Sequence, residues 1–134
     1  MSETLIIFDF DGTLVHEDGR TENLSLLASL REEGYELAIS SRNHSYHVRR
    51  ELQKLKILDI FTLVMADFRP KSFQIRDILY RFKLTGKNFK TVYFIDDYSV
   101  NIKRVQSDLS FVITLQFGKD VSSLEDVISR IETS

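Results

Sequence analysis

The chain of 134 residues has the size of one domain, and its 43% hydrophobic and 28% charged residues predict a soluble globular protein. With 18 basic and 20 acidic side chains, the net charge of -2 does not favour a dedicated nucleic-acid-binding protein. The absence of cysteine excludes disulfides and thiolate metal sites. Since we see neither a signal peptide nor an apolar run long enough to span a bilayer, we expect a cytoplasmic protein without a membrane partner.

The first half of the chain alternates short apolar runs with amphipathic segments. The run Leu5–Phe8 has the unbroken hydrophobicity of a strand buried on both faces, and residues 22–33 carry leucines at helical spacing. Leu37–Ile39 and Leu63–Met65 are predicted to be the second and third strands, with a helix over residues 46–55 between them. This order is typical of a protein in which strands and helices alternate.

The second half of the chain continues the alternation. The next predicted elements are a helix over residues 73–82, a strand over 92–95, a helix over 99–105 and a strand over 111–115. The last helix is predicted to begin near Ser122, where Ser122 and Glu125 fit a capping box. The whole pattern predicts a single domain over residues 1–134: a three-layer, Rossmann-like α/β fold with about five parallel strands and helices on both faces.

Polar residues follow the ends of the predicted strands, where parallel sheets bind their ligands. They form four groups along the chain, at residues 9–13, 40–43, 69–71 and 96–97. Because the carboxyl ends of parallel strands meet at one edge of the sheet, we expect these groups to converge on one crevice.

The chemistry of these residues suits phosphoryl transfer. Asp9 and Asp97 supply the oxygen ligands that Mg²⁺ prefers, and the cation would offset the repulsion between crowded carboxylates. A carboxylate can attack phosphorus to form an aspartyl-phosphate. Lys71 can neutralise charge on the transferring oxygens, and Ser41 can donate a hydrogen bond to one of them. Gly12 permits a tight turn that exposes backbone N–H groups to a phosphate.

In order and type, these motifs resemble those of the haloacid dehalogenase superfamily of aspartate-nucleophile hydrolases. The D-x-D-G-T motif of that superfamily is matched by residues 9–13, and its Ser or Thr after the second strand by Ser40–Ser41. Its lysine at a helix start is matched by Lys71, and its acidic pair after an apolar strand by Asp96–Asp97. Within the superfamily the chain looks most like the capless magnesium-dependent phosphatases: Ser41–Arg42 follow the second strand, Lys71 has no proline after it, and residues 96–101 follow the fourth strand. The connections are also too short for a large cap domain.

The resemblance implies a role for each acidic residue. Asp9 resembles the nucleophile, which also binds the metal. Asp11 resembles the general acid and base, which protonates the leaving alcohol, activates water and ligates the metal through its backbone carbonyl. Asp97 resembles the third metal ligand, because its spacing to Asn101 matches that of the family. Asp96 would then lie behind it or bind the metal through water, and the reverse assignment of Asp96 and Asp97 remains open.

Ser41 and Lys71 resemble the phosphate-binding pair of the family, with Ser40 as the alternative to Ser41. The predicted phosphate- and substrate-binding residues are Ser41, Lys71, Gly12, Thr13 and Arg42. For Arg42, Asn43 and Arg69, contact with the substrate and simple exposure to solvent are equally weighted alternatives.

The sequence thus predicts a Mg²⁺-dependent phosphomonoester hydrolase that acts through an aspartyl-phosphate. Its substrate would be a phosphorylated small molecule or macromolecule, and the protein a monomer or homo-oligomer. The site is expected to be open, because residues 14–20 are long enough only for a small flap. Two alternatives are a polynucleotide end phosphatase, against which the net charge weighs mildly, and a domain that binds a phosphorylated ligand without turnover.

Overall fold

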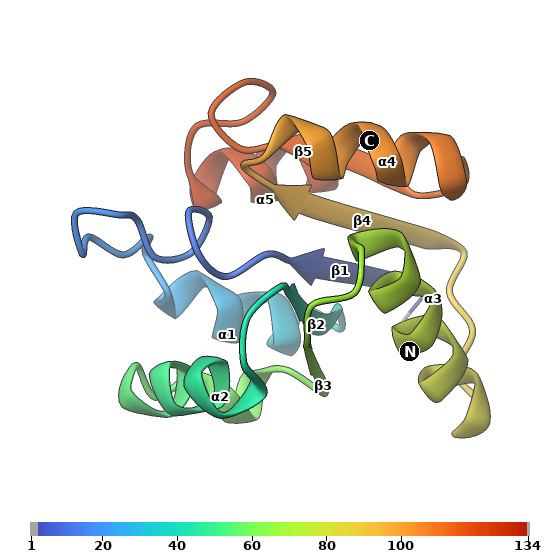
Figure 1. Ribbon diagram of the computed structural model, residues 1–134, viewed down its shortest axis with the longest axis horizontal. Coiled ribbons are helices and arrows are strands. Elements are labelled where there is room, and N and C mark those ends of the chain that lie inside the picture. Colours follow the sequence, from blue (N-terminus) through green and yellow to red (C-terminus); the bar gives the residue numbers. More distant parts are fainter. Residues whose placement is uncertain (1–2, 134) are drawn as a thin grey trace.

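A computed structural model describes residues 3–133, and its strands form a parallel sheet in the order β3-β2-β1-β4-β5 (Figure 1). The strands are β1 (Thr4–Phe8), β2 (Glu36–Ser41), β3 (Leu63–Ala66), β4 (Thr91–Asp96) and β5 (Ile113–Gln116). The helices are α1 (Ser25–Glu32), α2 (Ser45–Lys54), α3 (Lys71–Leu84), α4 (Ser99–Asp108) and α5 (Leu124–Glu132), with a 3-10 turn at Leu58–Ile60. The predicted three-layer α/β fold with five parallel strands is confirmed.

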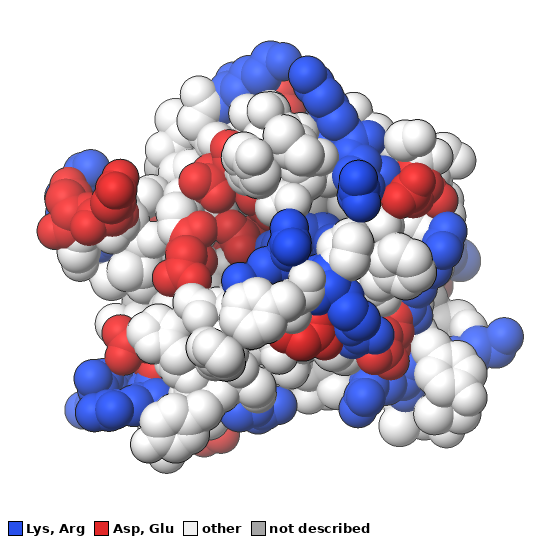
Figure 2. All heavy atoms as spheres, in the orientation of Figure 1, with Lys and Arg blue, Asp and Glu red and all other residues white. Residues whose placement is uncertain are grey.

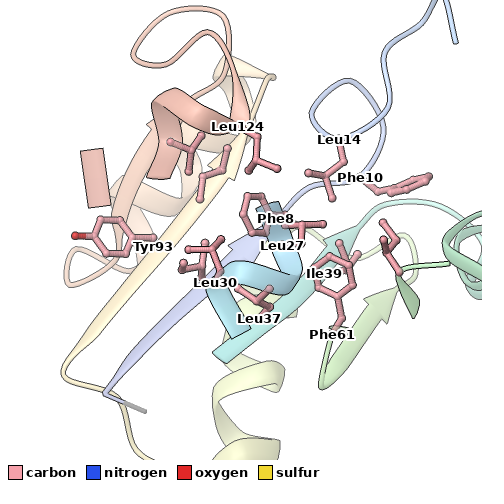
Figure 3. Close-up of a cluster of buried hydrophobic side chains, with 14 of the residues drawn as sticks. Phe8, Phe10, Leu14, Leu27, Leu30, Leu37, Ile39, Phe61, Tyr93 and Leu124 are labelled. Atoms are coloured by element: carbon pink, nitrogen blue, oxygen red, sulfur yellow. The ribbon is translucent and has the colours of Figure 1, made fainter. Parts of the chain in front are cut away.

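Strand β1 lies at the centre of the sheet, and Leu5 to Phe8 are 0% exposed. Because successive side chains point to opposite faces, Ile6 and Phe8 pack into one hydrophobic core and Leu5 and Ile7 into another. Helices α1, α2 and α5 cover the first core, part of which Figure 3 shows, and helices α3 and α4 cover the second. This double burial explains why the strand sequence is apolar without alternation.

The strand order places two functional segments side by side. From β1 the chain moves outward through β2 to β3, and then returns to the other side of β1 to form β4 and β5. In register, Phe8 faces Ile39 of β2 and Ile95 of β4, and the backbone N–H of Asp9 donates to Ile95 O over 2.8 Å. The order of strands therefore reverses between β1 and β4, where ligand sites of such sheets form.

The last helix begins one residue later than the sequence indicated. The N-cap of α5 is Ser123, whose hydroxyl accepts a hydrogen bond from the backbone N–H of Asp126 at 3.0 Å. The predicted capping box of Ser122 and Glu125 is therefore wrong. With Ser123 as the N-cap, Leu124 becomes the first residue of α5 and lies on its buried face. The packing of Leu124 against the core therefore favours Ser123 over Ser122 as the capping residue.

The other element boundaries moved by a few residues. Helix α3 starts at Lys71 rather than at residue 73, which brings this lysine into the first turn. Strand β5 starts at Ile113, since Phe111 lies in the preceding turn and is 60% exposed. No helix within residues 3–133 combines the length and the apolar character needed to cross a membrane.

After β1 the chain forms the small flap expected for residues 14–20, which projects from the sheet edge (blue in Figure 1). Backbone hydrogen bonds join His16 N to Arg20 O at 2.7 Å and Glu22 N to Leu14 O at 3.0 Å. The flap starts at Gly12, which has a φ of +84° and donates its N–H to Val15 O.

Candidate active site

Three carboxylates gather at the reversal point of the sheet. Asp9 follows β1, Asp96 ends β4 and Asp97 comes next, and one carboxylate oxygen from each lies within 4.8 Å of the others. Asp9 is 8% exposed and Asp96 0%, whereas Asp97 is open to solvent. Figure 2 shows acidic side chains beyond the tips of β1 and β4, directly beside basic ones. This arrangement concentrates negative charge at the bottom of an open site.

Lys71 brings a positive charge to this cluster from the first turn of α3. Its Nζ lies 2.8 Å from Asp9 Oδ1 and 3.3 Å from Asp96 Oδ2, and it also donates to Ser40 O. The side chain is 1% exposed, and its ammonium lies 5.5 Å from the ring centre of Phe94. Because the chain turns into α3 at Pro70, the helix starts at the sheet edge and aims the lysine at the carboxylates.

The cluster is short of positive charge. Burial raises the pKa of Asp9 to about 7; the ammonium of Lys71 opposes this shift, and the charge of Asp96 adds to it. Burial and the charge of Asp96 also raise the pKa of Asp97. A divalent cation would relieve this repulsion, and carboxylate oxygens are the ligands that Mg²⁺ prefers. The residues present therefore fit the predicted magnesium ion.

The structure separates the environments of Asp96 and Asp97. The carboxylate of Asp96 accepts hydrogen bonds from the backbone N–H of Tyr98 at 2.9 Å and from Asn101 Nδ2 at 3.0 Å. Asn101 is thus a hydrogen-bond partner of Asp96. Asp97 is the more exposed of the two, and its role as the direct metal ligand stays a prediction.

Gly12 fits closely against Asp97. A Cβ atom built on Gly12 would lie 2.7 Å from Asp97 Cγ, far closer than real Cβ contacts, and its positive φ also favours glycine. The backbone of the flap can therefore approach the acidic cluster only because residue 12 has no side chain.

Asp11 lies outside the carboxylate cluster and is exposed. Its Oδ2 accepts a hydrogen bond from Asn43 Nδ2 at 3.2 Å, and Asn43 in turn accepts one from the backbone N–H of His44. The sequence singled out Asn43 only as a candidate for substrate contact, because a partner 32 residues away cannot be read from local spacing. The role of Asp11 as general acid and base stays a prediction.

The two serines at the end of β2 differ in their surroundings. The hydroxyl of Ser40 donates to Gln74 Oε1 at 2.6 Å, and Gln74 Nε2 donates to Ser41 O at 2.9 Å. Since adjacent residues of a strand point to opposite faces, Ser40 faces α3 and Ser41 does not. Gln74 is a site-supporting residue that the sequence analysis missed, although it shares a helical face with Lys71, Ile75 and Ile78.

The remaining predicted binding residues are placed in different ways. Thr13 is 1% exposed, and its hydroxyl has no hydrogen-bond partner among residues 3–133. Arg42 is exposed and donates to Phe68 O at 3.2 Å. Arg69 pairs with Asp67 at 2.8 Å and Asp77 at 3.1 Å, so its guanidinium braces the loop before α3.

Comparison with known proteins agrees with this fold. Residues 6–66 match the family described as haloacid dehalogenase-like hydrolase. The matched segment contains Asp9, Asp11 and Ser41, and the fold supplies Lys71 and Asp96 at the same edge of the sheet. No curated protein matches the sequence. Residues 6–66, a little under half of the chain, are thus similar to the haloacid dehalogenase-like hydrolases, the family that the motifs resemble.

Several solved structures share the fold at low sequence identity. The N-terminal part of BF1531 from Bacteroides fragilis, containing a phosphatase domain complexed with Mg, has a TM-score of 0.75 and 18% identity; 93% of this chain and 39% of that chain are covered. The core domain of a proposed phosphoglycolate phosphatase from Streptococcus pneumoniae TIGR4 has a TM-score of 0.72 and 20% identity. That match covers 100% of this chain and 98% of the other.

A third structure is 3-deoxy-D-manno-octulosonate 8-phosphate phosphatase from Moraxella catarrhalis, in complex with magnesium ion, phosphate ion and KDO. Its TM-score is 0.53 at 21% identity, and the match covers 76% of this chain and 62% of that one. The chain thus spans well under half of the B. fragilis protein but nearly all of the S. pneumoniae core domain.

Proposed function

We propose that the protein is a capless, Mg²⁺-dependent phosphomonoester hydrolase that forms an aspartyl-phosphate on Asp9. The observation that carries this proposal is the position of Asp9: it lies at the strand reversal, 2.8 Å from Lys71 and within 4.8 Å of two more carboxylates. The B. fragilis and M. catarrhalis structures, described with Mg and as phosphatases, support the same reaction class.

In the first half-reaction, an oxygen of the Asp9 carboxylate attacks phosphorus, and the bond from phosphorus to the leaving oxygen breaks. The ammonium of Lys71 donates a hydrogen bond to Asp9 Oδ1 and favours the ionised carboxylate, which is the form that attacks. Asp11 donates its proton to the leaving oxygen, so the product departs as a neutral alcohol. The result is an acyl phosphate on Asp9 and a carboxylate on Asp11.

In the second half-reaction, Asp11 takes a proton from water as the water oxygen attacks phosphorus. The bond from phosphorus to Asp9 breaks, which releases inorganic phosphate and restores both carboxyl groups to their starting states. The hydrogen bond from Asn43 Nδ2 to Asp11 Oδ2 holds the Asp11 carboxylate while its other oxygen carries the proton.

The metal would be held by the carboxylates of Asp9 and Asp97 and the backbone carbonyl of Asp11, with Asp96 behind them. When bound, it offsets the charge of the cluster and polarises the phosphoryl group. Ser41, Lys71 and the backbone of Gly12 would hold the phosphoryl oxygens. Because Ser40 is already bonded to Gln74, Ser41 is the better placed of the two serines.

The proposal is tested by hydrolysis of para-nitrophenyl phosphate with Mg²⁺ and with chelator, in wild type and in Asp9→Asn. The matched control is Asp59→Asn, an exposed aspartate in the 3-10 turn that follows α2. We expect Mg²⁺-dependent turnover in wild type and control, and a loss of at least about 10³-fold in Asp9→Asn.

Equal activity in Asp9→Asn and wild type would overturn the role of Asp9. A folded wild-type protein that turns over nothing and binds no beryllium fluoride with Mg²⁺, as followed by fluorine NMR, would indicate a domain that binds phosphorylated ligands without catalysis.

A further inference from the structure

An exposed aromatic ring lies on a tightly held loop beside the site. Phe68 is 57% exposed, in the loop between β3 and α3. The backbone of this loop is bonded on three sides: Asp67 N donates to Ser41 O at 3.2 Å, Gln74 donates to Asp67 O at 3.2 Å, and Arg42 donates to Phe68 O at 3.2 Å. The hydrogen-bonded loop thus exposes a large apolar side chain that is not part of either hydrophobic core.

The ring of Phe68 has one aromatic partner, His44, at the start of α2. Their ring centres are 4.9 Å apart and their planes meet at 83°, the edge-to-face arrangement that aromatic pairs prefer. Since one ring packs against the other at its edge, the pair presents a firm surface rather than a single mobile side chain. The surface consists of Phe68 and His44, with Arg42 bonded to the same loop.

The position of this aromatic pair relative to Asp11 identifies what it would contact. Asn43 joins the two: its amide donates to Asp11 Oδ2, and its carbonyl oxygen accepts the backbone N–H of His44 at 2.8 Å. Under the proposed function Asp11 protonates the leaving oxygen, so the alcohol half of the substrate lies on the side of Asp11. The aromatic pair is on that side and is not part of the phosphate-binding set.

We propose that Phe68 and His44 bind the alcohol half of the substrate by stacking, and that the substrates are phosphate monoesters whose alcohol carries a planar ring. This inference rests on the proposed function and adds the substrate class. A planar ring, from a nucleobase or an aryl group, gains dispersion and quadrupole contacts on aromatic side chains that a sugar or a saturated ring gains only weakly.

The test compares two substrate pairs that differ in the ring: adenosine 5′-monophosphate against ribose 5-phosphate, and benzyl phosphate against cyclohexylmethyl phosphate. For each pair the ratio of kcat/KM is measured with purified full-length chain and Mg²⁺. The variants are Phe68→Leu, which removes the ring but stays apolar, and Phe68→Tyr, which keeps it. The control is Phe111→Leu, a 60% exposed phenylalanine in the turn before β5, at the opposite edge of the sheet.

We expect wild type to prefer the planar member of at least one pair by about tenfold. Phe68→Leu should bring that ratio close to one, Phe68→Tyr should restore it, and Phe111→Leu should leave it unchanged. A preference in the nucleotide pair alone would identify a nucleoside as the alcohol, and one in the benzyl pair alone an aryl group held next to the phosphate; either supports the proposal.

Ratios near one in wild type, or ratios that Phe68→Leu leaves unchanged, would overturn the proposal while Mg²⁺-dependent hydrolysis left the proposed function standing. A wild-type protein that hydrolyses none of the four esters nor para-nitrophenyl phosphate would overturn the proposed function, and this inference with it. Circular dichroism of each variant establishes that the fold is retained.

Discussion

Two buried carboxylates, Asp9 and Glu36, lie at opposite edges of the same sheet and have opposite surroundings. Glu36 begins β2, is 3% exposed and accepts hydrogen bonds from Arg31, Thr62 and Lys87, the last at 2.7 Å. Asp9 follows β1, is 8% exposed and shares the ammonium of Lys71 with Asp96. At one edge cations surround a carboxylate, whereas at the other edge carboxylates surround a cation.

This difference appears in the pKa values. Burial alone would raise the pKa of Glu36, but the hydrogen bonds from Lys87, Thr62 and Arg31 outweigh burial and hold it below its usual value. For Asp9, burial and neighbouring carboxylates outweigh Lys71 and raise the pKa to about 7. The charge of Glu36 therefore stabilises the fold, whereas that of Asp9 costs stability until a cation binds. The edge with the candidate active site therefore carries excess negative charge, which a bound cation would neutralise.

The largest effect is expected from removing the shared cation. Lys71→Met leaves two buried carboxylates without their partner and should lower the free energy of unfolding by about 3–5 kcal/mol in chelator. The same change at Lys87, which is 47% exposed, should cost much less because Glu36 keeps Arg31 and Thr62. Urea denaturation measures both losses of stability. Equal losses would contradict the expectation that the acidic cluster depends on Lys71 more than Glu36 depends on Lys87.

Removing the charge of Asp9, by contrast, should raise the free energy of unfolding. Because the pKa of Asp9 is raised, the folded protein binds a proton that the unfolded chain releases between about pH 4 and 7, so its ionisation lowers stability as pH rises through this range. In chelator at about pH 8, Asp9→Asn should therefore stabilise the fold, on the order of 2 kcal/mol.

This gain should shrink as the pH falls toward 4, where wild-type Asp9 is protonated too, and Mg²⁺ should reduce it at high pH by stabilising the wild type. Asp59→Asn is the control without such a gain. A destabilised Asp9→Asn in chelator would mean that the pair with Lys71 outweighs the repulsion.

At the other edge, Glu36→Gln should destabilise the fold by about 2 kcal/mol near neutral pH, since it removes a charged acceptor from three donors. A lowered pKa means that Glu36 contributes stability above its unfolded pKa and loses it as pH falls through its folded pKa. The gap between wild type and variant should thus close in acid. Exposed Glu125→Gln is the control, and a gap that persists in strong acid would contradict the assignment.

The smallest change in stability is expected at Gly12, but with a specific effect on metal binding. Gly12→Ala and Gly34→Ala both place a Cβ on a backbone with positive φ, and each should cost about 1 kcal/mol. A Cβ at Gly12 also meets Asp97, whereas one at Gly34 meets nothing within 4 Å. Titration with Mg²⁺ should show weaker binding in Gly12→Ala alone; equal affinities would exclude Asp97 from the metal site.

The fold was predictable because each strand is buried on both faces and each helix on one, so hydrophobic runs and helical spacing identify them. The expectation that polar residues after different strands would converge was also sound, and the structure brings Asp9, Lys71, Asp96 and Asp97 together. The capping serine of α5 was misplaced by one residue, because Ser122 and Ser123 are chemically equivalent and only the burial of Leu124 distinguishes them.

Pairings between distant residues were beyond the sequence. The bond from Asn43 to Asp11 and that from Gln74 to Ser41 join segments more than thirty residues apart. The spacing from Asp97 to Asn101 matches the family pattern, but only the structure shows that Asn101 donates its hydrogen bond to Asp96. Glu36 gave no local signal, since its partners come from three different elements or loops.

By itself, the sequence determined which residues gather at the candidate site, because the acidic, hydroxyl and ammonium groups that follow buried parallel strands meet at one edge of the sheet. Tertiary structure alone decided how charge is balanced among them. A pKa depends on burial and on every charge within a few ångströms, and those neighbours are set by the packing of strands and helices that lie far apart in the chain.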